Sequence, residues 1–223
     1  MLLAGGASYP AHNVLLVTDH DRTAASYDRI AADYAQHFAD EIDALPVDRS
    51  MLTAFAELTS GPVADVGCGT GNATAVLHRL GVDVFGVDIA GEMLEHARER
   101  LPGVRFTQGS MSELDMPEES LGGIVSWYSI VHTAFADLPG AFTEFARVLA
   151  PGGHLLLAFQ TGGATHHLTE AFEERVDLAF LRHEPEEVAD LLARAGLSPR
   201  ATLVRQPDGE RTPQAFLLAR KPR

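Results

Sequence analysis

The sequence predicts an α/β fold built on a mainly parallel sheet. Between residues 63 and 159, short apolar segments rich in Val, Ile and Leu alternate with segments whose apolar residues recur at helical spacing. Glycine or Pro-Gly turns separate most of them. Strands and helices that alternate in this way are typical of βαβ units, which place parallel strands side by side.

The expected elements follow in chain order. We expect strands at about 63–66, 82–87, 104–107, 121–127 and 154–159, and a terminal antiparallel pair at 197–205 and 216–219. Helices are expected at about 23–38, 48–58, 73–80, 92–101, 138–149 and 184–195. A chain of 223 residues with 46% hydrophobic residues is sufficient for one domain of this kind with a buried core.

The domain organisation is expected to be simple. Residues 1–21 have the composition of a flexible N-terminal tail, and 22–223 form a single domain. Within it, 22–60 would supply N-terminal helices that act as a lid, and 162–182 would be a cap insertion over the sheet. Residues 1–21 contain neither a basic start nor a long apolar run, which argues against a secretory signal, so we expect a cytoplasmic protein.

The net charge of the chain indicates which kinds of binding partner to expect. The 31 acidic residues against 17 basic ones give a formal net charge of −14. Such a surface repels phosphate backbones and anionic lipids, so neither nucleic acid nor a membrane is an expected partner. Cys68 is the single cysteine, and the chain has no H-E-x-x-H pattern, so no metal is expected either. The oligomeric state stays open between monomer and homodimer.

The strongest local signal is a glycine turn. Residues 63–71 read VADVGCGTG, in which a buried strand leads into a turn that opens a helix. Glycines there allow a ligand to approach the backbone closely. The dinucleotide fingerprint G-x-G-x-x-G would need a glycine at Asn72, and the Gly-Lys-Ser/Thr ending of a phosphate-binding loop is also missing. The turn therefore does not match a dinucleotide site, and a phosphate group is not the expected ligand there.

A carboxylate follows the next strand. Asp88 stands at the end of the strand expected at 82–87, where it can accept hydrogen bonds from both hydroxyls of a ribose. It can also cap the helix that follows it. With the glycine turn upstream, we favour ribose binding.

These motifs resemble those of a known family. The segment DVGCGTG at 65–71, VFGVDI at 84–89 with Met93, and LAPGGHL at 149–155 are similar to class I S-adenosylmethionine-dependent methyltransferases. The segment YDRIAADY at 27–34 resembles the lid helix of their small-molecule, ubiquinone-biosynthesis-like (type 11) branch. The resemblance implies a Rossmann-like three-layer sandwich with a seven-stranded sheet whose last strand is antiparallel.

The resemblance also implies roles for individual residues. The methionine part of the cofactor would lie on the turn formed by Gly67, Cys68, Gly69 and Gly71, with Asp65 near its amino group and Tyr27 closing over it. Asp88 would take the ribose hydroxyls. The adenine would contact Ile89, Met93, Ser110 and Met111, and Trp127 would face the cofactor from the end of its strand.

Histidines are the candidates for chemistry on the acceptor. His132 follows the strand expected at 121–127 by five residues, which would place it near the transferred methyl group. It would serve as general base if the acceptor is a hydroxyl, for which a pKa near neutrality suits best, or it would have a structural role. Tyr128, His166 and His167 are further candidates for contacts with substrate.

The predicted function is methyl transfer from S-adenosylmethionine to oxygen, nitrogen or carbon of a small molecule, which leaves S-adenosylhomocysteine. One alternative is a protein that binds this cofactor without methylating, as a scaffold or as the catalyst of another reaction. A nicotinamide-dependent oxidoreductase is a weaker alternative because of Asn72, and a protein or RNA methyltransferase is disfavoured by the acidic composition.

Overall fold

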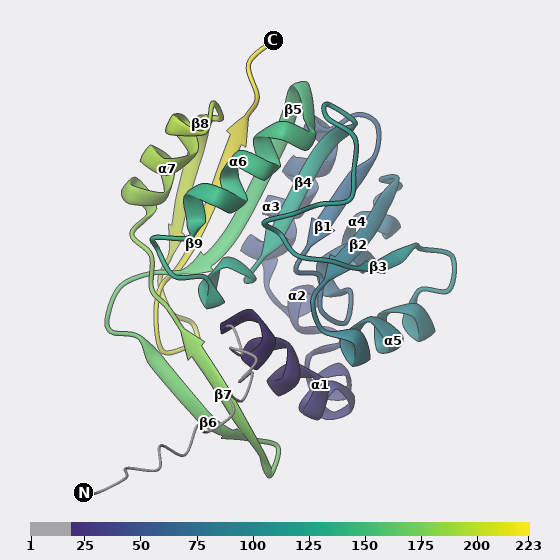
Figure 1. The fold of residues 1–223 in the computed structure, drawn as a ribbon, viewed down its shortest axis with the longest axis vertical. Helices are drawn as coiled ribbons and strands as arrows, with labels where there is room; N and C mark the ends of the chain where they lie inside the picture. Colours follow the sequence, from purple (N-terminus) through teal and green to yellow (C-terminus); the bar gives the residue numbers. More distant parts are fainter. Residues whose placement is uncertain (1–18) are drawn as a thin grey trace, which may run out of the picture.

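A computed structural model describes residues 19–223 of the chain as a three-layer α/β sandwich (Figure 1). Its seven-stranded sheet has the order β3-β2-β1-β4-β5-β9-β8. The strands are β1 (Val63–Val66), β2 (Val84–Asp88), β3 (Phe106–Gln108), β4 (Leu121–Trp127), β5 (Leu149–Gln160), β8 (Ser198–Arg205) and β9 (Gln214–Arg220). The pairs among β3, β2, β1, β4 and β5 are parallel, whereas β9 runs antiparallel to both β5 and β8. This confirms the expected fold class.

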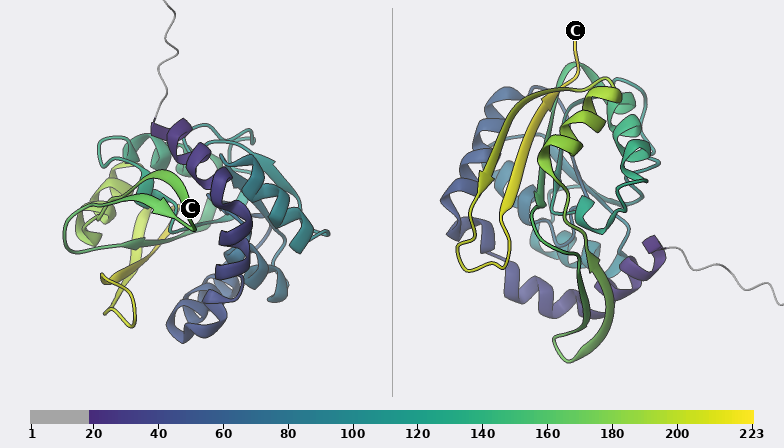
Figure 2. Two further views of the ribbon diagram at one scale, coloured as in Figure 1. Left: turned by 90° about the horizontal axis from the view of Figure 1, so that it is seen from below. Right: turned by 90° about the vertical axis from the view of Figure 1, so that its left-hand side faces the viewer.

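Helices α3 and α4 cover one face of the sheet and α6 and α7 cover the other, as the right-hand view of Figure 2 shows. The helices are α1 (Asp19–Phe38), α2 (Glu41–Ala44), α3 (Pro46–Leu58), α4 (Asn72–Arg79), α5 (Gly91–Arg100), α6 (Leu138–Val148) and α7 (Pro185–Arg194), with a short 3-10 helix η1 (Ile130–His132). Most begin and end within two residues of the expected positions.

Strand residues alternate between two apolar cores. In β5, Leu155 and Leu157 face the core under α6 and α7, whereas Leu156 faces the core under α3 and α4. Successive side chains of a strand point to opposite faces, so a strand that is covered on both sides is apolar throughout. This is why the strand segments read as continuous apolar runs, with all four residues of β1 buried.

The segment after β5 differs in structure from a simple loop. Residues within the expected cap at 162–182 form a two-stranded antiparallel hairpin of β6 (His166–Ala171) and β7 (Glu174–Phe180). Its buried side chains Val176 and Leu178 pack with Ile30 of α1. The hairpin and α1 lie together below the sheet in Figure 1, at the edge where the parallel strands end.

Helix α1 is attached to three other elements. Asp28 accepts a hydrogen bond from the Glu92 backbone N–H at the start of α5, at 2.9 Å. Ser26 exchanges hydrogen bonds with the Asp177 backbone of β7, and the Asn72 amide donates to the Phe38 carbonyl at 3.0 Å. The helix begins at Asp19, so residues 19–21 of the expected tail are helical, and the rest of the tail lies outside the described residues.

Candidate active site

A pocket of about 150 Å³ lies at the carboxyl edge of β1, β2 and β4, between that edge and α1. Ligands of open α/β sheets bind at this edge, near the point where the strand order reverses. The structure brings together there most of the residues that the sequence singled out. These are Tyr27, Asp65, Gly67, Cys68, Gly69, Asp88, Ile89, Met93, Ser110, Met111, Trp127, Tyr128 and His132.

The glycine turn needs glycine for two different reasons. Gly67 has a φ of +77°, and a Cβ there would stand 2.2 Å from the Cβ of Ser129. Gly69 has a φ of +52°, but a Cβ there would meet no atom within 4 Å. The first glycine therefore permits close packing of β1 on the segment after β4, whereas the second leaves open space above the backbone. Such space is where a ligand can approach the turn.

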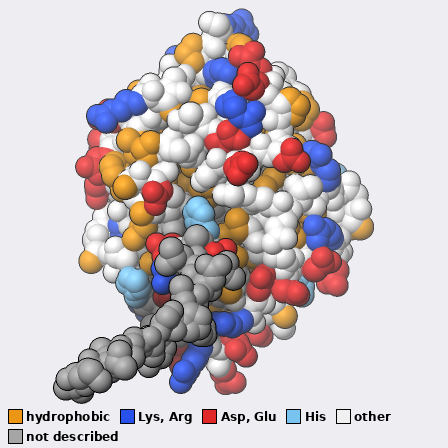
Figure 3. Space-filling model, in the orientation of Figure 1, with side chains coloured by type: hydrophobic (Ala, Val, Ile, Leu, Met, Phe, Trp, Pro, Cys, Tyr) orange, Lys and Arg blue, Asp and Glu red, His pale blue; other side chains and the backbone are white. Residues whose placement is uncertain are grey.

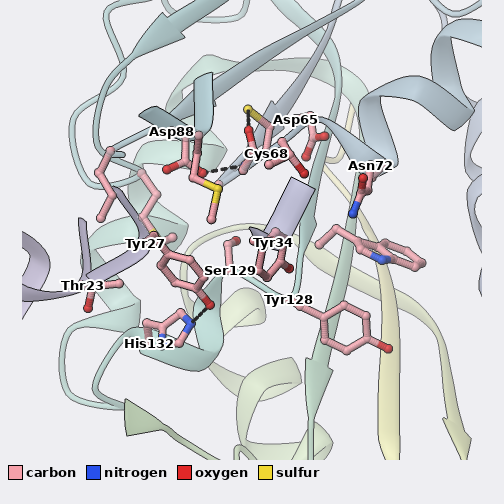
Figure 4. Close-up of a pocket in the computed structure, with 18 of the residues that line it drawn as sticks. Thr23, Tyr27, Tyr34, Asp65, Cys68, Asn72, Asp88, Tyr128, Ser129 and His132 are labelled. Atoms are coloured by element: carbon pink, nitrogen blue, oxygen red, sulfur yellow. Dashed lines mark hydrogen bonds between the residues drawn. The ribbon is translucent and has the colours of Figure 1, made fainter. Parts of the chain in front are cut away.

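Asp88 fixes the shape of this turn. Its carboxylate accepts hydrogen bonds from the Gly69 N–H at 2.7 Å and from the Ala90 N–H, just before α5, at 2.9 Å. Figure 4 shows the hydrogen bond between Asp88 and the glycine turn, at the top of the pocket. Burial raises the pKa of Asp88, and the backbone N–H donors oppose that shift. Each oxygen retains a second lone pair, so the same carboxylate can also accept from a ligand.

Asp65 presents an unsatisfied acceptor. The side chain is fully buried, and its Oδ2 accepts a hydrogen bond from the Thr74 hydroxyl at 2.5 Å. Its Oδ1 has no partner in residues 19–223. Burial raises the pKa of Asp65 to about 7, while the Thr74 hydrogen bond opposes this shift. A buried carboxylate oxygen without a donor is costly, and a cationic ligand group would relieve that cost.

The opposite side of the pocket offers an apolar slot. Met93 is 2% exposed and lines the pocket together with Ile89 and Met111. The Ser110 hydroxyl accepts a hydrogen bond from the Ser112 N–H at 3.2 Å, so it is already engaged in its own loop. Cys68 is buried, and burial raises the pKa of its thiol. The thiol is thus a small apolar lining group and no nucleophile at neutral pH.

His132 and Tyr27 meet at the lower side of the pocket (Figure 4). The Tyr27 hydroxyl lies 2.8 Å from Nε2 of His132, and Nδ1 lies 2.9 Å from the Ala179 carbonyl of β7. A carbonyl only accepts, so Nδ1 carries the proton and Nε2 accepts from Tyr27. Burial lowers the pKa of His132 to about 4, which differs from the near-neutral value expected of a base. The ring is therefore neutral at pH 7.

A second cavity of about 460 Å³ adjoins the first. The two cavities share the lining residues Tyr27, Tyr34, Glu41, Ile42, Trp127 and Tyr128. Tyr128 has a φ of +54°, in the left-handed region that side chains seldom occupy. Its ring points away from His132 in Figure 4, and its hydroxyl lies 3.4 Å from Asp48. The position of Tyr128 therefore belongs to the second cavity as much as to the first.

Three expected residues lie elsewhere. Gly71, at a φ of +79°, precedes α4, and a Cβ there would face Phe106 rather than the pocket. His166 lies at the start of β6, where its ring packs near Phe180, and His167 is exposed. Neither histidine lines either cavity, although Phe180, which pairs with His166 across the hairpin, lines the second one. Contacts of this pair with substrate stay a prediction.

Other lining residues were not foreseen. Thr23, Tyr34, Glu41, Asn72 and Ser129 all contribute to the first pocket. The helical spacing of Tyr27 and Tyr34 on one face of α1 was a usable signal for Tyr34. Ser129, which donates to the Val66 carbonyl at 3.0 Å, had no signal in the sequence. Within residues 19–223, no group of three His, Cys, Asp or Glu side chains is arranged to hold a metal, and none of the described helices has the length and apolar character of a bilayer span.

The fold and this pocket define an open α/β protein that binds an adenosine-type cofactor over a glycine turn. Residues 63–153 match the family model described as "Methyltransferase domain". The chain is 34% identical over 181 residues to trans-aconitate 2-methyltransferase of Rhizobium meliloti (strain 1021), a match that includes 78% of this chain and 65% of that protein. It is also 27% identical over 151 residues to malonyl-[acyl-carrier protein] O-methyltransferase of Serratia marcescens, 68% of this chain and 57% of the relative. The chain thus spans less than two thirds of the length of either relative.

Solved structures agree on the fold. Magnesium protoporphyrin IX methyltransferase from Synechocystis PCC 6803, determined with bound S-adenosylmethionine, superposes with a TM-score of 0.71 at 16% identity, over 94% of this chain and all of that one. The PH0226 protein of Pyrococcus horikoshii OT3 gives 0.67 at 23% identity, over 83% and 92% of the two chains. The family match over residues 63–153, these relatives and the shared fold together support a class I S-adenosylmethionine-dependent methyltransferase.

Proposed function

We propose that this protein transfers the methyl group of S-adenosylmethionine to a small-molecule acceptor and releases S-adenosylhomocysteine. The observation that carries the proposal is the placement of Asp65 and Asp88 on either side of an open glycine turn in one pocket. The relatives named for trans-aconitate and malonyl-[acyl-carrier protein] support methylation of metabolites and, for the second, an oxygen acceptor.

The residues present fit the cofactor. The unpaired Oδ1 of Asp65 suits the ammonium of its methionine part, directly or through water. Asp88 has lone pairs for the ribose hydroxyls, and Met93 and Ile89 offer an apolar surface to the adenine. The bound cofactor would supply a methyl group on a positively charged sulfur, together with its own leaving group. The protein then has to align the acceptor and exclude water.

We also propose roles for α1, the hairpin and His132 from their positions around the pocket. Helix α1 and the hairpin cover the pocket as lid and cap, within one domain over the described residues. His132 offers an unprotonated Nε2 that can accept a hydrogen bond from an acceptor O–H or N–H once the Tyr27 hydroxyl moves away. The proton of the acceptor would pass to this nitrogen as the methyl group arrives.

Calorimetric titration of the full chain with S-adenosylmethionine, S-adenosylhomocysteine and NAD tests the proposal. We expect both adenosyl ligands to bind and NAD not to bind. Asp88→Ala should weaken adenosyl binding by about 100-fold, since two hydrogen bonds to a charged group are lost. Glu118→Ala, an exposed site outside both cavities, is the matched control. A preference for NAD, or no binding of either adenosyl ligand, would overturn the proposal.

A second step tests catalysis itself. Release of S-adenosylhomocysteine should depend on an added acceptor and should be lost in Asp88→Ala. Tight adenosyl binding with no methylated product from any metabolite fraction would instead favour a cofactor-binding protein that does not methylate.

A further inference from the structure

The second cavity has the form of an acceptor site. Its volume of about 460 Å³ holds a small organic molecule rather than a single water. The six lining residues that it shares with the cofactor pocket make the two spaces continuous. Its walls are largely apolar and come mostly from α1 and the hairpin, with contributions from η1 and the segment between α2 and α3. They include Ile30, Phe38, Leu45, Val131, Leu168, Phe172, Leu178 and Phe180.

The charged groups in this cavity are predominantly acidic. Its lining contains the carboxylates of Glu41, Asp48, Glu170 and Glu210 and a single cation, Arg205. On the outer face shown in Figure 3, by contrast, acidic and basic side chains are interspersed. The acidic character of the cavity is therefore more pronounced than that of this face.

The one cation is already neutralised. The Arg205 side chain is 11% exposed and forms ion pairs with Asp48 at 3.1 Å and Glu210 at 2.5 Å. The Arg205 guanidinium lowers the pKa of Glu210 to about 2, so Glu210 is ionised at neutral pH. An incoming carboxylate would have to displace one of these two partners and leave it without a counter-ion, which is costly in a buried place.

Glu41 experiences the excess of negative charge. Its side chain makes no hydrogen bond or ion pair with any residue of 19–223. Its pKa is raised, first by partial burial and then by the carboxylates of Asp48 and Glu210, whereas His37 and Arg205 oppose the shift. The field at this point of the cavity is therefore negative even with His37 and Arg205 in place, and a cation would be stabilised there.

We propose that the second cavity binds the methyl acceptor as an amphipathic cation, a protonated amine on an apolar body. The apolar body would lie against α1 and the hairpin, with the amine between Glu41 and Glu210. The inference rests on the proposed function only in calling the ligand an acceptor. The charge preference follows from the cavity itself.

Three probes of similar length test the preference: 3-phenylpropylamine, 3-phenylpropanol and 4-phenylbutyrate. Their binding to the full chain is measured by calorimetry at neutral pH, with and without saturating S-adenosylhomocysteine. We expect the amine to bind at least about tenfold more tightly than the carboxylate, with the alcohol between them, and the difference to shrink at high salt. Equal or tighter binding of the carboxylate, or no binding of the amine at millimolar concentration, would overturn the inference.

Charge-neutralising variants locate the effect. Glu41→Gln and Glu210→Gln should each reduce the preference for the amine by about threefold or more. Glu174→Gln, which removes the same charge at the exposed turn of the hairpin, should leave the preference unchanged. A preference that survives both cavity variants would contradict the proposal. Glu41→Gln is the variant less prone to disturb the fold, because the Glu41 side chain forms no ion pair, whereas Glu210 is paired with Arg205.

The two proposals fail in different ways. If S-adenosylhomocysteine binds and the carboxylate is preferred, the charge inference is wrong and methyl transfer stands. If the amine is preferred and no adenosyl ligand binds, methyl transfer is wrong and the charge preference of the cavity stands.

Discussion

The Tyr27 hydroxyl donates a hydrogen bond to Nε2 of His132 across 2.8 Å and so joins the lid helix to the candidate base. The direction of this bond follows from the Ala179 carbonyl on the other ring nitrogen. An acceptor hydroxyl that reaches Nε2 must take the place of the Tyr27 hydroxyl. In this conformation Tyr27 therefore covers the candidate base.

The His132 ring should make folding stability depend on pH. Its pKa is about 4 in the folded protein against about 6.5 in an unfolded chain. Between these values the unfolded state binds more protons, so stability is full above about pH 6.5 and falls as the pH drops toward 4. We expect a loss of up to about 3 kcal/mol from this residue. Urea unfolding from pH 7 to pH 4.5 measures it, and His132→Gln should flatten that part of the profile; an unchanged slope in the variant would contradict the assignment.

Asp65 should affect the pH dependence of folding stability in the direction opposite to that of His132. Its pKa is raised to about 7 by burial, so the folded state holds a proton that the unfolded chain releases near pH 4. Stability should therefore fall as the pH rises from about 4 to about 7. Asp65→Asn removes this slope, and we expect the cofactor-free variant to be more stable than wild type at pH 8 by about 2 kcal/mol.

The same substitution should impair cofactor binding. The neutral amide that replaces the carboxylate cannot offer a second charged oxygen to a cationic group, so calorimetry should show S-adenosylmethionine binding at least about tenfold weaker. Thr74→Val, which removes the hydroxyl that opposes the pKa shift, serves as a comparison. A variant that is less stable than wild type at pH 8, yet binds normally, would refute this account of Asp65.

The two glycines of the turn should respond differently to alanine. Gly67→Ala places a Cβ 2.2 Å from that of Ser129 and should destabilise the protein by more than about 2 kcal/mol. Gly69→Ala meets no atom and should cost about 1 kcal/mol for its positive φ, yet should weaken cofactor binding strongly. Denaturant unfolding and calorimetry separate the two effects. Ser129→Gly should restore part of the stability of Gly67→Ala and should do nothing for Gly69→Ala.

Removal of one partner of the buried Asp48–Arg205 ion pair should destabilise the fold, because the other partner stays buried with less compensation. Asp48 is 1% exposed and joins α3 to β8, segments that are far apart in sequence. Asp48→Ala leaves Arg205 with Glu210 as its only charged partner and should destabilise the protein by about 3 kcal/mol. The exposed pair of Arg79 and Asp43 is the control, where Asp43→Ala should cost less than about 1 kcal/mol. Similar losses at both pairs would contradict the argument.

Much of the fold could be predicted from the sequence because it depends on local patterns. A strand covered on both faces is apolar throughout, as β1 is, and a turn that needs positive φ contains glycine. The hairpin was beyond such reasoning. None of the side chains of β6 is fully buried, so its sequence has no clear apolar pattern. The side chains that its residues contact come from α1 and β7, and α1 is distant in sequence. The length of the hairpin segment alone indicated an insertion, without indicating strands.

The residues of the candidate site also fall into two groups, those that the sequence indicates and those that only the folded chain brings together. Asp65 and Asp88 could be singled out because each lies near the end of an apolar strand, beside a glycine turn. Glu41 and Arg205 could not, because only the folded chain brings the start of α2 next to the end of β8. The lowered pKa of His132 also depends on burial by the lid and the hairpin, which the residue type does not reveal.

The hairpin has a consequence for how this scaffold could acquire new substrates. Its Ala179 carbonyl fixes the tautomer of His132, its Asp177 backbone holds α1, and its apolar side chains line the second cavity. A sequence change that reshapes the acceptor space by shifting β7 would therefore also turn the imidazole and loosen the lid. Selection for a different acceptor is thus constrained to side-chain replacements that leave the β7 backbone in place, and insertions would be tolerated only at the hairpin tip around Glu173, which lies outside the cavity lining.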